Sequence, residues 1–232
     1  MISSLNTTPV TFKSTLVTNK KPTSFDEIPS LDSRYTTNEQ KHKTVTILES
    51  SKGTDQIANA MEKASQAANE LIKKGYNVLT GCGNSGIMGS AYNAAHEAES
   101  NPFNKNAGEN LAIVVSPLWG DENLEDCRAI GKADSEAERI KKFEKTSDNF
   151  IVFPGSAATL QEAATLITDK VYPKGDDTPK NIFLVGKEYF KGLKEQYDRI
   201  YEAGLLKVKP EELFKVVDSP DEILQDLPEI KD

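Results

Sequence analysis

From Thr44 onward, the chain alternates between short apolar runs and longer segments with an apolar residue at every third or fourth position. The short runs are typical of buried strands, and the longer segments are typical of amphipathic helices. We predict strands at 44–48, 76–80, 111–115, 150–153, 181–185 and 214–217. Helices are expected at 54–74, from the glycine-rich loop to about 98, at 135–146, 159–170 and 189–203, and from Pro220 onward.

Alternating strands and helices predict right-handed crossovers and a mostly parallel sheet. The expected fold class is therefore α/β, a Rossmann-like doubly wound sheet of six or seven strands with helices on both faces. Ligands of such sheets bind outside the carboxyl ends of the strands. The loops that begin at Glu49, Gly81, Ser116 and Pro154 all follow strands, so we expect them at that edge. The long connection 116–134 is the segment that we expect to be most mobile.

Residues 1–43 have a different composition from the rest of the chain. Fourteen of these residues are Ser or Thr, and no acidic residue occurs before Ser24. A transit peptide would be rich in arginine, whereas the first arginine here is Arg34. We predict an N-terminal arm or extension over 1–43 and a single Rossmann-like domain over 44–232.

Charge and residue usage exclude several classes of partner. The chain has 28 basic and 36 acidic residues and a net charge of −8, which argues against nucleic-acid binding. No apolar run approaches the length of a membrane span. His42 and His96 lack metal-ligand spacing, so no metal site is expected. Two cysteines without a C-x-x-C motif fit a reduced, cytoplasmic location.

The first candidate site is the loop G-C-G-N-S-G-I-M-G from Gly81 to Gly89, which follows a strand and opens a helix. Glycines let the backbone approach a phosphate, and helix N-termini favour anions. The loop is not a Walker A motif, because it lacks G-K-[ST], and no acidic ribose ligand is evident after it. A phosphate-binding loop and a tight turn without a ligand both remain open.

The second candidate site follows the strand 150–153, where Pro154 and Gly155 lead into a helix that carries Glu162. Thr159-x-x-Glu162 matches a capping box, so Glu162 is either a helix cap or a site carboxylate. Ser135-x-x-Glu138 has the same ambiguity, and there we favour the cap. Arg139 follows on a helix that leads into the same strand, so its side chain lies either on the surface or in this pocket.

These blocks resemble the LOG (Lonely Guy) family of cytokinin riboside 5′-monophosphate phosphoribohydrolases, which belongs to a lysine decarboxylase-like superfamily. The family motif G-G-G-x-x-G-L-M-G is matched at Gly81, Gly83, Gly86, Met88 and Gly89. Its second block, an E-R-K helix, a strand and P-G-G-x-G-T-x-x-E, is matched at Glu138-Arg139, Pro154-Gly155, Thr159 and Glu162. The segment 49–53 is similar to the family's C-G-S-S-x-G, and the resemblance covers about Thr44 to Leu227.

The resemblance implies a homodimer, without a cofactor, that cleaves the N-glycosidic bond of a cytokinin-type or AMP-like nucleoside 5′-monophosphate to free base and ribose 5-phosphate. It implies that Arg139 and Glu162 are catalytic. A carboxylate can stabilise the oxocarbenium charge on the ribose, and an arginine can hold the phosphate or the departing base. The expected substrate contacts are Ser50, Gly83, Asn84, Ser85, Gly86, Met88, Gly155, Ser156, Ala157, Ala158 and Thr159.

The chain also departs from the family pattern. Ser156 and Ala158 replace glycines, and each would carry about 1 kcal/mol or more of strain if the loop needs positive φ there. Ile140 stands where the family has lysine. These changes motivate an alternative, a non-catalytic nucleotide-binding or sensor protein on the same fold. A true lysine decarboxylase would need a lysine for pyridoxal phosphate, and no lysine has that context.

Overall fold

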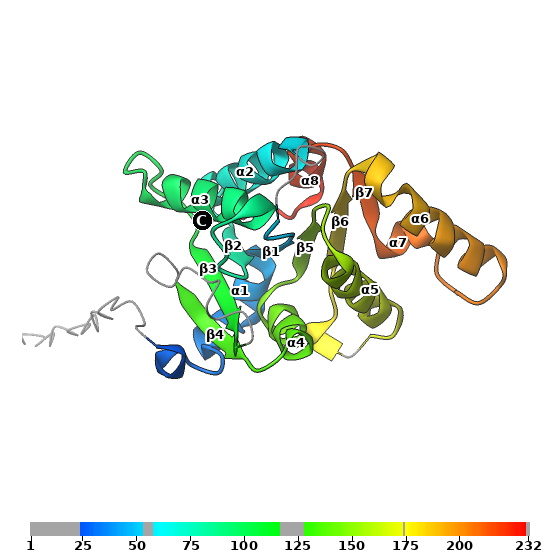
Figure 1. Ribbon diagram of the computed structural model, residues 1–232, viewed down its shortest axis with the longest axis horizontal. Coiled ribbons are helices and arrows are strands. Elements are labelled where there is room, and N and C mark those ends of the chain that lie inside the picture. Colours follow the sequence, from blue (N-terminus) through cyan, green and yellow to red (C-terminus); the bar gives the residue numbers. More distant parts are fainter. Residues whose placement is uncertain (1–23, 53–57, 117–127, 174, 231–232) are drawn as a thin grey trace, which may run out of the picture.

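The computed structural model describes residues 24–52, 58–116, 128–173 and 175–230 (Figure 1). Its strands form one sheet in the order β4-β3-β2-β1-β5-β6-β7, and all neighbouring strands are parallel. The strands are β1 (Thr44–Leu48), β2 (Asn77–Thr80), β3 (Asn110–Val115), β4 (Ala129–Ala133), β5 (Asn149–Val152), β6 (Asn181–Val185) and β7 (Lys215–Val217). The predicted α/β fold class is confirmed.

Helices cover both faces of the sheet (Figure 1). The helices α2 (Ala58–Lys73), α3 (Gly86–Ser100) and α8 (Pro220–Asp226) pack in one apolar cluster, which includes Val45 and Ile47 of β1. The helices α4 (Glu136–Thr146), α5 (Ala157–Val171), α6 (Lys187–Glu202) and α7 (Pro210–Leu213) pack in the other, which includes Leu48. Successive strand residues point to opposite faces, so a single apolar run supplies both layers.

Strand β4 lies inside the segment 116–134, which we expected to be a connection only. Gly131 and Lys132 interrupt its apolar pattern, and that hid the strand from the sequence analysis. Because β4 is one of the two edge strands, a polar and irregular composition suits it. The expected mobility of this connection falls partly on residues 117–127, which lie outside the described residues.

Residues 24–43 pack against the sheet rather than extending away from it. Ile28 and Tyr35 are buried, and Leu31 forms an antiparallel bridge to Gly131 in β4. A short helix, α1 (Asn38–Lys43), then leads directly into β1. Within the described ranges, no helix has the length and apolarity needed to cross a membrane.

The strand order creates a switch point between β1 and β5. The chain builds β2, β3 and β4 on one side of β1 and then returns to place β5 on the other side. The two strands are joined at their ends by the hydrogen bond that Phe153 N donates to Leu48 O (2.9 Å). Crevices at such switch points are the usual ligand sites of open α/β sheets, so a ligand is expected to bind at the residues that follow Leu48 and Phe153.

Candidate functional site

The two predicted catalytic residues, Arg139 and Glu162, meet at this edge of the sheet. Helix α4 leads from β4 to β5 and α5 follows β5, so both helices begin at the carboxyl edge. Arg139 lies in the first turn of α4 and Glu162 in the second turn of α5, and both are buried. Arg139 Nη2 is 3.7 Å from Glu162 Oε1 and 2.6 Å from Glu136 Oε2. The structure therefore brings the pair together and adds a second carboxylate, Glu136.

The environment of Glu162 changes its acidity. Burial raises the pKa of its carboxyl to about 7; Arg139 opposes this rise and Glu136 adds to it. Removing a carboxylate from water disfavours its charged form, and the 3.7 Å ion pair compensates for only part of that cost. Glu162 can consequently exchange a proton near neutral pH.

The capping-box interpretation of Glu162 is wrong. Helix α5 begins at Ala157, and its N-cap is Ser156, whose side chain accepts a hydrogen bond from Ala158 N (3.3 Å). Glu162 is therefore too far along the helix to cap it. For Glu138 the favoured cap is borne out in part. Ser135 Oγ accepts a hydrogen bond from the Glu138 amide, but Glu138 Oε2 accepts from Asp134 N (2.8 Å), the amide before the N-cap residue.

The glycines of the Gly81 loop are needed for close packing. A Cβ on Gly81 would lie 2.9 Å from Arg139 Nη1, and a Cβ on Gly83 would lie 2.6 Å from Met88 Sδ. Gly86 has φ +62, and a Cβ there would lie 2.5 Å from the carbonyl carbon of Ser51. Gly81 thus lets the Arg139 guanidinium lie against the end of β2.

The loop after β1 packs on the start of α3. Ser50 O accepts a hydrogen bond from Met88 N (3.2 Å), and Ser51 O accepts one from Ser85 Oγ (2.9 Å). Asn84 and Ser85 are exposed, whereas Gly83 is buried. Among the predicted contacts of this loop, Asn84 and Ser85 are the residues most open to a ligand.

The anticipated strain at Ser156 and Ala158 is absent. Neither residue has positive φ, and Ser156 is extended, with φ −81 and ψ −175. Among the described non-glycine residues, Cys82, which replaces the middle glycine of the first motif, has positive φ, at 67. That conformation costs about 1–2 kcal/mol for a residue with a Cβ.

The start of α5 is open to solvent. Ser156, Ala157 and Ala158 are exposed, and Leu160 N, bonded to Ser156 O (3.1 Å), is the first amide of the helix with a backbone acceptor. Thr159 is buried beneath Gly155, where a Cβ would lie 2.2 Å from Thr159 Oγ1. Amides at such a helix start form a natural site for a phosphate.

Glu49 belongs to this site but was not among the predicted site residues. It follows β1 directly, is 6% exposed, and neither of its carboxyl oxygens has a hydrogen-bond partner among the described residues. Burial raises its pKa well above the usual value; Glu162 adds to the rise and Arg139 opposes it. Its position after a central strand was the available signal, but the sequence contains no sign of its burial.

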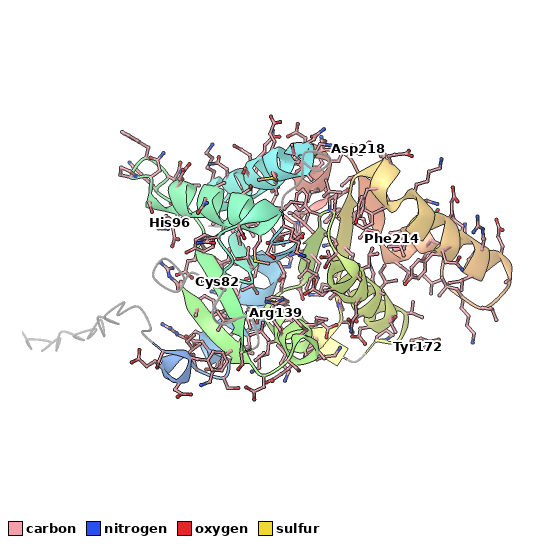
Figure 2. The ribbon with its side chains drawn as sticks, in the orientation of Figure 1. Cys82, His96, Arg139, Tyr172, Phe214 and Asp218 are labelled. Carbon is pink, nitrogen blue, oxygen red and sulfur yellow. The ribbon has the colours of Figure 1, made fainter. Side chains whose placement is uncertain are left out.

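One cavity among the described residues lies away from this edge of the sheet. It is a surface groove of about 640 Å³ along β7, between α6, α7 and α8, with Phe214 in its lining (Figure 2). It does not include Arg139 or Glu162. We assign the functional site to the β1–β5 edge because buried charged groups converge there. Within the described ranges, no cluster of His, Cys, Asp and Glu side chains could hold a metal ion.

Known proteins resemble this chain in sequence and in fold. The cytokinin riboside 5′-monophosphate phosphoribohydrolase LOG5 of Arabidopsis thaliana is 27% identical over 169 residues, which are 72% of this chain and 69% of that protein. The molybdenum cofactor binding protein of Rippkaea orientalis has a TM-score of 0.52 and 20% identity, over 78% of this chain and 91% of that one. The Moco carrier protein of Chlamydomonas rheinhardtii has a TM-score of 0.50 and 18% identity, over 79% and 96%.

The family itself is established by a sequence model that matches residues 88–227 and is described as "possible lysine decarboxylase". This span is more than half of the chain and includes α4, β5 and the start of α5, which form the site. By that match the chain belongs to the possible lysine decarboxylase family.

Proposed function

We propose that this protein hydrolyses the N-glycosidic bond of a nucleoside 5′-monophosphate of AMP or cytokinin type, releasing the free base and ribose 5-phosphate. The observation that carries the proposal is the buried Arg139–Glu162 pair at the β1–β5 switch point, with 3.7 Å between Nη2 and Oε1. The similarity to the phosphoribohydrolase LOG5 supports the same reaction.

In this proposal Glu162 acts on the ribose. Cleavage of the glycosidic bond builds positive charge on the ring, and a carboxylate in a water-poor site stabilises that charge strongly. The pKa of about 7 lets Glu162 also accept a proton from the attacking water. Arg139, held by Glu136 at 2.6 Å, orients the Glu162 carboxylate and the departing base.

In this proposal the 5′-phosphate of the substrate binds at the start of α5. The exposed backbone at Ser156, Ala157 and Ala158 gives amide donors at the positive end of a helix. Asn84 and Ser85 are exposed on the neighbouring loop and supply side-chain contacts to the nucleotide. We further propose that two copies associate, which light scattering of the purified protein would test.

The family is described as a possible lysine decarboxylase, but our proposal involves no pyridoxal phosphate. The described buried lysines are Lys41 and Lys142. Lys41 Nζ binds the Asp177 carboxylate (3.0 Å), and Lys142 Nζ binds Glu138 (2.8 Å). Neither lies in the Arg139–Glu162 site, so they do not fit a lysine that holds that cofactor.

The test is incubation with AMP and with isopentenyl-AMP, followed by chromatography for free base. Arg139→Ala and Glu162→Ala should each reduce base release by at least about 10²-fold while the circular dichroism spectrum is retained. If the wild-type protein releases no base from any purine or pyrimidine monophosphate, the proposal fails.

One observation favours a second candidate, a non-catalytic nucleotide-binding protein. Ser156 replaces a glycine and its hydroxyl already accepts from Ala158 N, so one amide of the phosphate site is occupied. Thermal stabilisation by AMP without turnover would support this candidate. The same stabilisation accompanied by base release would reject it.

A further inference from the structure

Glu49 is the one carboxyl of the site to which the proposed reaction assigns no role. It follows β1 directly at the switch point, and it is 6% exposed. Neither oxygen finds a hydrogen-bond donor or acceptor among the described residues. A buried polar group without a partner reduces stability by about 1–3 kcal/mol. An unpaired buried group of this kind is therefore a candidate for a catalytic role, in which a ligand supplies the missing partner.

The charged groups around Glu49 determine its protonation state. Glu162 and Arg139 interact with it electrostatically, and Glu136 lies on the other side of Arg139, 2.6 Å from Nη2. The single guanidinium of Arg139 therefore interacts with three carboxyl groups, and it cannot compensate fully for the burial of all of them. Burial raises the pKa of Glu49 well above its usual value, and the neighbouring Glu162 adds to this rise, so the surroundings of Glu49 favour its neutral form.

We propose that Glu49 is a further catalytic residue, the acid that hydrogen-bonds to and protonates a purine-type leaving base, while Glu162 acts as the carboxylate. The proposal rests on the proposed hydrolase function. A neutral carboxyl keeps one O–H donor, and a ring nitrogen of a purine is an acceptor that can receive it. Two carboxyls whose surroundings separate their proton affinities are the usual basis for assigning one as acid and the other as base.

Every proton that is released in this reaction is also taken up. The C1′–N bond breaks and its electron pair goes to the base, which receives the Glu49 proton on nitrogen. Water forms the new C1′–O bond and gives its proton to the Glu162 carboxylate. Transfer of that proton to the Glu49 carboxylate restores both groups, so one water is consumed and no other reactant is needed.

Glu49→Gln is the appropriate variant, because an amide replaces a neutral carboxyl of the same shape and cannot release a proton. The matched control is Glu144→Gln. Glu144 in α4 is also buried and also has an oxygen without a partner, and burial raises its pKa to about 7, but its contact is Lys141 (2.7 Å), outside the site. Thermal unfolding and circular dichroism establish that both variants are folded.

With AMP as substrate, kcat of Glu49→Gln should fall by about 10²- to 10⁴-fold, the usual contribution of a general acid. With 7-methylguanosine 5′-monophosphate, whose base leaves without needing a proton, the loss should shrink to less than about tenfold. Glu144→Gln should match the wild type on both substrates. An equal loss on both substrates, or no loss on AMP, would overturn the role of Glu49.

Infrared spectroscopy tests the inference without turnover. Near pH 8 the wild type and Glu144→Gln should both show the carbonyl band of a protonated carboxyl, and Glu49→Gln should lack it. Persistence of the band in Glu49→Gln would overturn the assignment. A wild-type protein that releases no base at all refutes the hydrolase proposal instead, so the two failures are distinguishable.

Discussion

Replacing Glu162 with glutamine should make the folded protein more stable above neutral pH. The pKa of Glu162 is about 7 in the folded protein, against an ordinary value of 4.5. The difference of about 2.5 units, at 1.36 kcal/mol per unit, corresponds to about 3 kcal/mol. Glutamine has no charge to bury and therefore removes this penalty.

The sign and the pH window follow from proton binding. The folded state holds the Glu162 proton more tightly than the unfolded chain, so the free energy of unfolding falls as pH rises from about 4.5 to about 7. Above pH 7 the penalty is complete, and below about pH 4.5 it is absent. The advantage of Glu162→Gln should therefore be about 3 kcal/mol near pH 8 and should vanish near pH 4.

Urea unfolding followed by circular dichroism at several pH values measures this difference, provided that the slope with urea is unchanged. Glu138→Gln is a control of opposite sign. Hydrogen bonds from Lys142 and from the Asp134 amide lower the pKa of Glu138, so removing its charge should reduce stability near neutral pH. A Glu162→Gln protein that is no more stable than the wild type near pH 8 would refute the reasoning.

Three further substitutions test the construction of the site. Gly81→Ala should lower kcat by about 10²-fold, because its Cβ would lie 2.9 Å from Arg139 Nη1; Gly192→Ala, with no atom within 4 Å of the new Cβ, should leave kcat unchanged. Ser156→Ala should lower the free energy of unfolding by about 1 kcal/mol through loss of the α5 cap, whereas Ser156→Gly should lower it by only a few tenths, both measured by urea unfolding. Tyr189→Phe removes the hydroxyl that donates to the carbonyl of the Pro-Gly turn (2.6 Å) and should raise KM for AMP, measured by steady-state kinetics, with kcat retained.

The local pattern of apolar and polar residues was sufficient to predict the fold class. Apolar runs such as 111–115 and 181–185 are buried on both faces, so their composition alone indicates central strands of a parallel sheet. The edge strand β4 was missed because an edge needs fewer apolar residues, and Gly131 and Lys132 leave too weak a pattern. Element boundaries depended on competing local signals: Ser156 and Thr159 are both good N-cap residues, and the structure selects Ser156.

For the site, too, some features could be predicted from the sequence and others depended on the tertiary structure. The motif spacing alone indicated Arg139 and Glu162, because their position in the chain relative to β5 carries the resemblance. Only the tertiary structure decides that Arg139 lies against Gly81 and that Glu162 is buried beside it. Glu49 illustrates the limit most clearly, since a glutamate that ends an apolar run has the sequence appearance of a solvated loop residue. Its burial arises only in the folded chain, and its proton affinity depends on that desolvation and on Glu162 and Arg139, which are far from it in sequence.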